Sequence, residues 1–229
     1  MKSKLLFVVA VVAALGILPI TAVRAQTQPA AANPQNTAVE RPALKAGDRW
    51  DYRVIDGWKN VVKETFAFQV SSVTDKEIQV VRKAGSGAVA TITETPDLNA
   101  VSVVSTSGNN FLYSPDNGDY AFPLFVGKTY AANASYTRKN GSGSYALSAT
   151  VVGWEQVTVP AGTFTALKIT REGFYKATTN LGSGTGKMKV TVWYVPELKE
   201  KAKVEYEDTD WSGRPSSRVI TELTGYQVN

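Results

Sequence analysis

Apolar residues recur at every second position along most of this chain. Trp50, Tyr52 and Val54 alternate with polar residues, and the same pattern returns in the ranges 62–70, 145–151, 188–194 and 202–206. A period of two is typical of β-strands that bury one face and expose the other to water. No stretch of a dozen residues has the 3.6-residue period of an amphipathic helix. The sequence therefore predicts a mainly β protein with few, short helices.

Turn-forming residues separate the alternating stretches. Asn140-Gly141 is a strong two-residue hairpin signal, and the segments 159–162, 181–186 and 196–199 also predict turns or loops. Short strands with hairpin-length connections favour an antiparallel sheet of roughly ten strands, and a sheet of that size tends to curl. We expect an all-β fold in which this curved sheet forms a barrel or half-barrel, with a two-sheet sandwich as the alternative.

The first residues have the layout of a secretory signal peptide. Lys2 and Lys4 precede an unbroken apolar run over 5–18, and small residues lead to a cleavage point after Ala25. The run is shorter than the ~20 residues that a membrane-spanning helix needs, and no later apolar run is long enough. We expect a signal peptide over 1–25 and a periplasmic or secreted protein with no transmembrane segment after cleavage.

The remaining chain divides into a linker and one domain. Residues 26–43 are rich in Ala, Pro, Gln and Asn without an apolar period, which predicts a flexible linker. Residues 44–229 have the length of a single domain. Removing the signal peptide leaves 22 basic against 20 acidic residues, so the net charge falls from +5 to about +2. Because these basic residues are scattered, we expect no nucleic-acid partner.

The chain contains neither histidine nor cysteine. A Ser-His-Asp triad, a thiolate nucleophile and the commonest zinc ligands are therefore excluded. The acidic run over 205–210 lacks the twelve-residue loop of a calcium site, and GSGTGK at 182–187 lacks the spacing of a phosphate-binding loop. We expect a non-enzymatic protein with no metal and no cofactor.

Four segments together resemble a known group of proteins: LKAGDRWDYRV at 44–54, FPLFVGKTY at 122–130, VTVPAGTFTALKI at 157–169 and VWYVPELKEKAKVEY at 192–206. The group comprises bacterial exported proteins classed as domains of unknown function, in which a VPAGTF turn is followed by a WY-P hairpin. It is distantly similar to the half-barrels of the Lol lipoprotein carriers. The resemblance implies a curved β-sheet or barrel and supplies no catalytic residues.

Large apolar side chains share one side of their strands: Trp50, Tyr52, Phe66, Phe68, Val192 and Tyr194. They are either an ordinary core, since aromatic residues favour strands, or the lining of a cavity, since β-barrels can enclose a small ligand. Both interpretations stay open. The second is our leading hypothesis for function: binding of an apolar or amphipathic, lipid-like ligand inside the barrel.

The stretch 113–130 is irregular yet rich in apolar residues. A loop of this composition must fold back onto other apolar surface. We expect it to cover the barrel as a lid, and its large apolar residues are Tyr120, Phe122, Leu124 and Phe125.

Two other functions remain open. Trp58, Trp154 and Trp211 lie beside turn residues, where they could bind a protein or glycan of the cell envelope. Alternatively, two carboxylates that face each other across a cleft could hydrolyse glycosides without histidine. The candidates for this hydrolase lie near aromatic residues: Asp51, Asp56, Glu64, Glu155 and Glu172.

Overall fold

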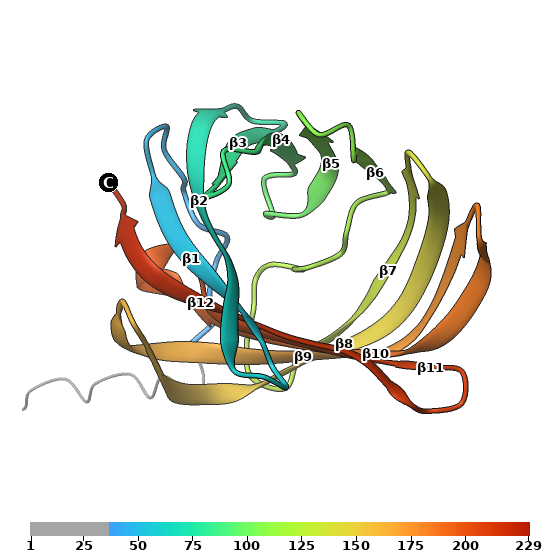
Figure 1. The fold of residues 1–229 in the computed structure, drawn as a ribbon. Helices are drawn as coiled ribbons and strands as arrows, with labels where there is room; N and C mark the ends of the chain where they lie inside the picture. The colour runs from blue at the N-terminus through green and yellow to red at the C-terminus, as the bar shows by residue number, and fades with distance from the viewer. Residues whose placement is uncertain (1–36) are drawn as a thin grey trace, which may run out of the picture. The chain divides into compact units, whose positions relative to one another are not determined.

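In the computed structural model, which describes residues 37–229, twelve antiparallel strands close into one barrel (Figure 1). Each strand pairs with its neighbours in the chain, and β12 pairs with β1 to complete the ring. The predicted all-β fold is therefore confirmed as a closed barrel, with twelve strands where roughly ten were expected. The described part contains a single 3-10 turn, η2 (Pro196–Leu198). Within residues 37–229, no helix has the length and apolar character to cross a membrane.

The strands differ widely in length, from 4 residues in β6 to 19 in β8. Their bounds are β1 (Arg49–Asp56), β2 (Val61–Val73), β3 (Ile78–Ala84), β4 (Val89–Glu94), β5 (Ala100–Ser105), β6 (Phe111–Ser114), β7 (Thr129–Arg138), β8 (Gly141–Val159), β9 (Gly162–Thr179), β10 (Gly182–Val195), β11 (Glu200–Asp210) and β12 (Pro215–Gln227). The short β6 pairs with β5 only at Ser102–Leu112 and Val103–Phe111. The weakest seam of the barrel therefore lies between β5 and β6.

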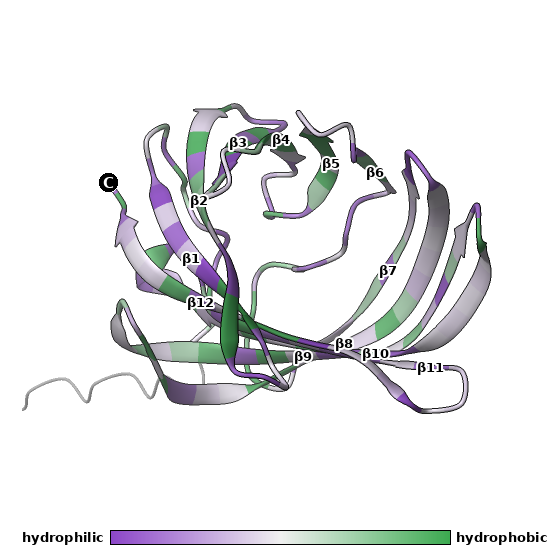
Figure 2. Ribbon diagram, in the orientation of Figure 1, coloured by the Kyte–Doolittle hydropathy of each residue, from purple (hydrophilic) through white to green (hydrophobic). Residues whose placement is uncertain are grey.

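The period of two places apolar side chains on the inner face of the barrel, and Figure 2 shows apolar and polar residues alternating along the strands. Tyr52 of β1 lies between Phe66 of β2 and Leu223 of β12. Tyr52 and Leu223 are almost completely buried, and the rings of Tyr52 and Phe66 are 5.3 Å apart. Cross-strand pairs of this kind stabilise a sheet by roughly 0.2–1 kcal/mol each.

The connections between strands alternate between the two ends of the barrel because every strand runs antiparallel to the next. One end, which we call the plugged end, carries the connections 74–77, 95–99, 115–128, 160–161 and 196–199. The other, which we call the hairpin end, carries the connections 57–60, 85–88, 106–110, 139–140, 180–181 and 211–214.

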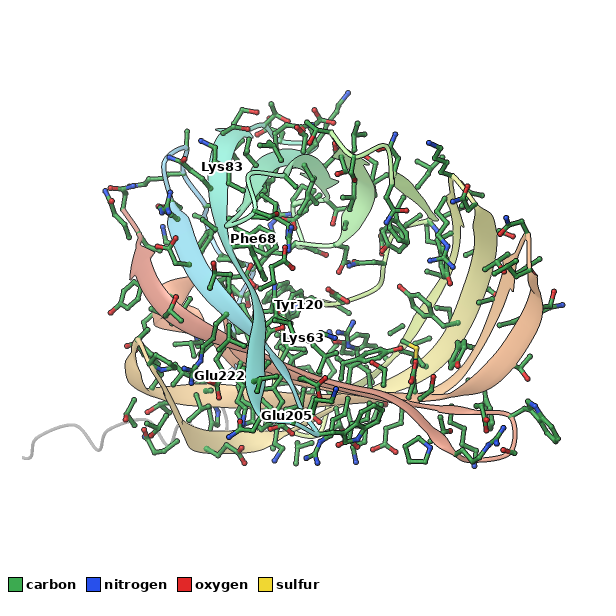
Figure 3. All side chains as sticks on the ribbon, in the orientation of Figure 1. Lys63, Phe68, Lys83, Tyr120, Glu205 and Glu222 are labelled. Carbon is green, nitrogen blue, oxygen red and sulfur yellow. The ribbon has the colours of Figure 1, made fainter. Side chains whose placement is uncertain are left out.

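The segment 115–128, which joins β6 to β7, runs back into the barrel interior, and we call it the plug (Figure 1). Its Leu124 is fully buried and bridges Val39 through backbone hydrogen bonds of 2.7 and 2.8 Å. The side chain of Asn99 donates to the Tyr120 carbonyl oxygen at 2.9 Å and accepts from the Tyr120 N–H at 2.8 Å. Tyr120 itself lies inside the ring of strands (Figure 3). These side-chain partners let an irregular segment lie in the interior without unpaired backbone groups.

The β8–β9 hairpin extends beyond the barrel wall at the plugged end. A bulge between Val151 and Gly153 changes the register of β8 there. The Ala161 N–H at the hairpin tip donates to the Leu223 carbonyl oxygen at 3.1 Å, and Phe164 joins the main core. This hairpin contains the VPAGTF segment, so that motif contributes to closing the plugged end.

The structure corrects one sequence prediction and leaves two others mostly outside the described residues. The segment 181–186 was predicted as a loop, but residues 182–186 form the start of β10, and the turn itself is confined to 180–181. The error arose because its glycines indicate flexibility in sequence, whereas here they pair in register with β9. The predicted signal peptide and most of the predicted linker lie outside the described residues, and the remainder of the linker includes Val39, which pairs with the plug.

Candidate functional site

Aromatic rings from several strands surround a cavity of about 320 Å³ inside the barrel, towards the hairpin end. The cavity is lined by residues of β6 to β11: Phe111, Tyr113, Tyr136, Tyr145, Tyr175, Ala177, Met188, Tyr206 and Asp208. The rings of Phe111, Tyr113 and Tyr136 lie 6.0 to 6.2 Å from one another. Its volume is at the lower limit of small-molecule pockets, and its lining combines aromatic rings with tyrosine hydroxyls and one carboxylate.

Glycines on the inner face make room for two of these rings. A Cβ atom at Gly143 would overlap the ring of Tyr136, and one at Gly186 would come within 2.8 Å of the ring of Tyr175. Glycine in a strand interior weakens the strand but permits such close approach. The rings of Tyr136 and Tyr175 therefore pack close to the strand backbone of the barrel wall, and this packing leaves space in the barrel interior.

One carboxylate oxygen in the cavity wall has no partner. The Tyr206 hydroxyl donates to Asp208 Oδ2 at 2.8 Å. Asp208 Oδ1 is buried and has no hydrogen-bond partner among the described residues. Because buried polar groups are nearly always hydrogen-bonded, this oxygen leaves Asp208 only partly compensated among the described residues.

The plug contacts the wall of the cavity through Tyr145. The Tyr145 hydroxyl donates to the Asn117 carbonyl oxygen at 2.7 Å, and Arg171 of β9 forms an ion pair with Asp119. Burial, followed by the charge of Asp119, raises the pKa of Tyr113 to about 12. Both contacts join the barrel wall to the plug, so the shape of the cavity depends on the position of the plug.

A second group of charges is buried between the strands and the plug. Glu200 forms an ion pair with Lys201, and the Tyr52 hydroxyl donates to the Lys201 carbonyl oxygen at 2.7 Å. Burial, followed by the charge of Glu200, raises the pKa of Glu94 to about 8. The interior therefore holds a protonatable acid that sequence reasoning did not identify.

The residues predicted from sequence to contact a ligand lie towards the plugged end. Trp50, Tyr52, Val192 and Tyr194 are almost completely buried in the main core, and the Trp50 indole N–H donates to the Leu198 carbonyl oxygen at 2.9 Å. Phe66 and Phe68 are partly buried, with the Arg82 guanidinium 4.3 Å and the Lys201 ammonium 5.6 Å from their ring centroids. None of these six lines the aromatic cavity, so their role as ligand contacts stays a prediction.

The four residues predicted as a lid all belong to the plug. Tyr120 and Leu124 are buried, Phe122 is half-buried and Phe125 is exposed. The rings of Tyr120 and Phe122 lie 5.5 and 5.6 Å from that of Tyr194. They pack at the end opposite the hairpin tips, and a lid movement stays a prediction.

The residues of the two alternative functions do not converge. Trp58 and Trp211 are exposed at hairpin-end turns, whereas Trp154 packs against the core towards the plugged end. The hydrolase candidates each contact another group instead of a second carboxylate: Asp51 pairs with Arg49, Glu64 with Arg82, Glu155 with Lys168 and Glu172 with Lys189, and Asp56 accepts from backbone N–H groups. No group of three or more potential metal ligands occurs within residues 37–229.

A larger hollow of about 700 Å³ lies along the outer face of β8 to β10 beside the β11–β12 turn. It is bordered by the exposed rings of Phe174 and Trp211 and by Lys187, whose ammonium lies 5.7 Å from the Phe174 ring centroid. We call this hollow the outer groove, and it places the exposed Trp211 beside a concave surface.

Sequence reasoning missed the residues that line the aromatic cavity. The usable signal is a set of tyrosines at inner positions of successive strands, most of them opposite a glycine or another ring. Tyr145 faces Tyr175 across β8 and β9, and Tyr136 faces Gly143 across β7 and β8. Apolar alternation alone does not separate such a lining from a packed core.

No protein-family model and no curated protein matches the chain. Among solved structures, a candidate exported protein with a YmcC-like fold from Bacteroides fragilis is 15% identical, with a TM-score of 0.51, over 83% of this chain and 100% of that one. A candidate lipoprotein from Parabacteroides distasonis is 17% identical, with a TM-score of 0.49, over 83% and 100% of the two chains. The hypothetical lipoprotein YmcC from Escherichia coli is 12% identical, with a TM-score of 0.45, over 78% and 83%. The Bacteroides fragilis likeness shows a shared fold.

Proposed function

We propose that this protein is an exported, non-enzymatic binding protein that holds an apolar or amphipathic small molecule in the aromatic cavity. The observation that carries the proposal is the set of rings from β6 to β9 and β11 around a space of about 320 Å³. A cavity with such walls favours apolar ligands because binding removes apolar surface from water. The signal-peptide pattern of the sequence supports export, and the fold that the chain shares with a candidate exported protein agrees with it.

The expected affinity is moderate. A ligand that loses roughly 300 Å² of apolar surface gains about 7.5 kcal/mol, before contacts with polar groups are added. Association costs offset part of this gain. We therefore expect dissociation constants of about 10–200 µM for a simple apolar probe.

The test uses 1-N-phenylnaphthylamine, a neutral fluorophore whose emission rises in apolar surroundings. Ala177 lines the cavity and Ala146 lines the outer groove. We expect Ala177→Phe to fill the cavity and weaken probe binding at least about tenfold, which corresponds to ~1.4 kcal/mol. Ala146→Phe, a matched enlargement on the outer face, leaves the affinity within about twofold. Absence of any binding to the wild-type protein would refute the proposal.

The outer groove favours a second candidate function, an interaction with a protein or glycan of the envelope. Trp211 is 79% exposed and Phe174 is 64% exposed beside this hollow, and exposed aromatic side chains in a concave surface mark binding sites. If Ala146→Phe weakens probe binding and Ala177→Phe does not, this second function replaces the first.

A further inference from the structure

We propose that the ligand of the aromatic cavity carries a positive charge, an ammonium or trialkylammonium group that lies among the tyrosine rings against Asp208. This inference deepens the proposed function and rests on it. The lining combines the two features that recognise such cations, which are the faces of several aromatic rings and one carboxylate.

The rings supply the first feature. Phe111, Tyr113 and Tyr136 lie within 6.2 Å of one another on β6 and β7, while Tyr175 and Tyr206 line the cavity from β9 and β11. Each aromatic face carries partial negative charge, and a cation within about 6 Å of a ring centroid is attracted to it. An enclosure of rings therefore selects a cation over an anion of the same shape.

Asp208 supplies the second feature. Its Oδ2 is held by the Tyr206 hydroxyl, while its Oδ1 is buried without a partner among the described residues. A buried charge with a free oxygen is costly until a hydrogen-bond donor or a cation reaches it. An ammonium group in the cavity would provide that partner.

The charged groups around the cavity bear on the sign of the ligand's charge. Arg171 is already paired with Asp119 of the plug. Burial, followed by the charges of Asp208 and Asp210, raises the pKa of Tyr175, because negative charge nearby disfavours the phenolate. Arg138, which faces Phe111 in the β6–β7 pairing, does not line the cavity, but its Nε is buried without a hydrogen-bond partner among the described residues, so Asp208 must outweigh this opposing charge.

The test compares three probes that share one chain and differ in the charge of the head: octyltrimethylammonium, octan-1-ol and octyl sulfate. Each is measured below its critical micelle concentration by displacement of 1-N-phenylnaphthylamine and by calorimetry. We expect the cation to bind about tenfold more tightly than the alcohol, and the sulfate to bind most weakly.

The variants assign the preference to the site. Asp208→Asn keeps the size of the side chain and an acceptor for Tyr206, and we expect it to weaken the cation about tenfold while octan-1-ol changes less than about twofold. Glu207→Gln is the matched control. Glu207 directly precedes Asp208 in β11, but its side chain lies on the outer face and pairs with Arg218. Tyr136→Leu removes one ring without touching the carboxylate, and we expect it to weaken the cation selectively.

The outcomes separate the two proposals. If the three probes bind equally, or if Asp208→Asn leaves the preference unchanged, the charge inference is wrong while the proposed function stands. If neither the three probes nor 1-N-phenylnaphthylamine binds, the proposed function fails and the inference fails with it. A cation preference lost in Asp208→Asn and kept in Glu207→Gln supports both.

Discussion

A single buried carboxylate, that of Asp48, holds the two ends of the domain together at the plugged end. Asp48 is fully buried and accepts hydrogen bonds from the Lys45 N–H at 2.9 Å and the Asn229 N–H at 2.8 Å, with the Lys199 ammonium at 3.3 Å. Burial alone would raise the pKa of Asp48, but these partners outweigh it and lower the pKa. One carboxylate therefore joins the entry to β1, the turn after η2 and the C-terminus.

We expect Asp48→Ala to lower the free energy of unfolding by about 3–5 kcal/mol, because it leaves several buried donors and a lysine without their partner. Urea denaturation followed by tryptophan fluorescence measures the change. Asp51→Ala is the control, since Asp51 forms only a half-exposed pair with Arg49, and its cost should stay below about 1 kcal/mol. Equal costs for the two variants would contradict this account of Asp48.

Glu94 makes stability depend on pH in the opposite direction to most carboxylates. Its pKa of about 8 in the folded protein lies above its ordinary value of 4.5. Between these values the folded state keeps a proton that the unfolded state has lost, so the free energy of unfolding falls as pH rises from about 4.5 to 8. The loss attributable to Glu94 is of the order of 4–5 kcal/mol.

Glu94→Gln carries no titrating group and should flatten this decline. Denaturation midpoints at pH 5, 6.5 and 8 for the variant, the wild type and Glu77→Gln, which changes an exposed turn residue, provide the measurement. The interpretation is wrong if the wild-type midpoint rises over this range, or if Glu77→Gln flattens the curve as much as Glu94→Gln.

Among the elements, the plug is the one that departs most from regular structure. It is held by side chains from the barrel: Asn99 pairs with the backbone of Tyr120, and the Tyr130 hydroxyl donates to the Asp119 carbonyl oxygen at 2.8 Å. The backbone of the plug is therefore held by a few polar contacts with side chains, whereas the strands are held by continuous ladders of backbone hydrogen bonds.

We expect Asn99→Ala to free the backbone of Tyr120 and to cost about 2–4 kcal/mol, since it leaves two buried groups unpaired. Hydrogen exchange of the Tyr120 amide should accelerate more than exchange of the strand amides. Asn110→Ala removes a comparable side-chain contact, to the Ser105 N–H at 2.8 Å, in an exposed hairpin-end turn, and it should leave Tyr120 protected. Unchanged exchange at Tyr120 in Asn99→Ala would contradict this account of the plug.

The strands could be predicted from sequence because their inner and outer faces differ in polarity, as at Trp50 to Val54. Their exact register could not, because bulges such as those between Val54 and Ile55 and between Trp193 and Tyr194 insert a residue without a sequence signal. The cavity was missed for a different reason. The tyrosines that line the cavity have the same alternation in sequence as the core residue Tyr52. Only the position of the plug determines which part of the barrel interior is packed and which part is open.

At the scale of the whole domain, the barrel is filled at one end and hollow towards the other. The core around Trp50 and Tyr194 lies at the plugged end, and the rings around Tyr136 and Tyr175 enclose space towards the hairpin end. The residues that stabilise the core at the plugged end are therefore different from those that line the cavity.

This separation predicts that ligand binding adds to stability without changing the fold. At a free probe concentration ten times its dissociation constant, the protein should gain about 1.4 kcal/mol. For a domain of this size that gain raises the melting temperature by roughly 3–6 °C. Thermal denaturation with 1-N-phenylnaphthylamine should show this shift in the wild type and in Ala146→Phe, and a shift of about 1 °C or less in Ala177→Phe.

The central claim, that the hollow end of the barrel is a ligand site, is tested most directly through Met188. The sequence has two methionines, Met1 and Met188, and Met188 lines the cavity. In protein labelled with methyl-¹³C methionine, we predict that the Met188 ε-methyl resonance shifts on addition of 1-N-phenylnaphthylamine and shows a nuclear Overhauser effect to the probe. If fluorescence reports saturated binding while the Met188 resonance does not move, the ligand lies elsewhere and the claim is wrong.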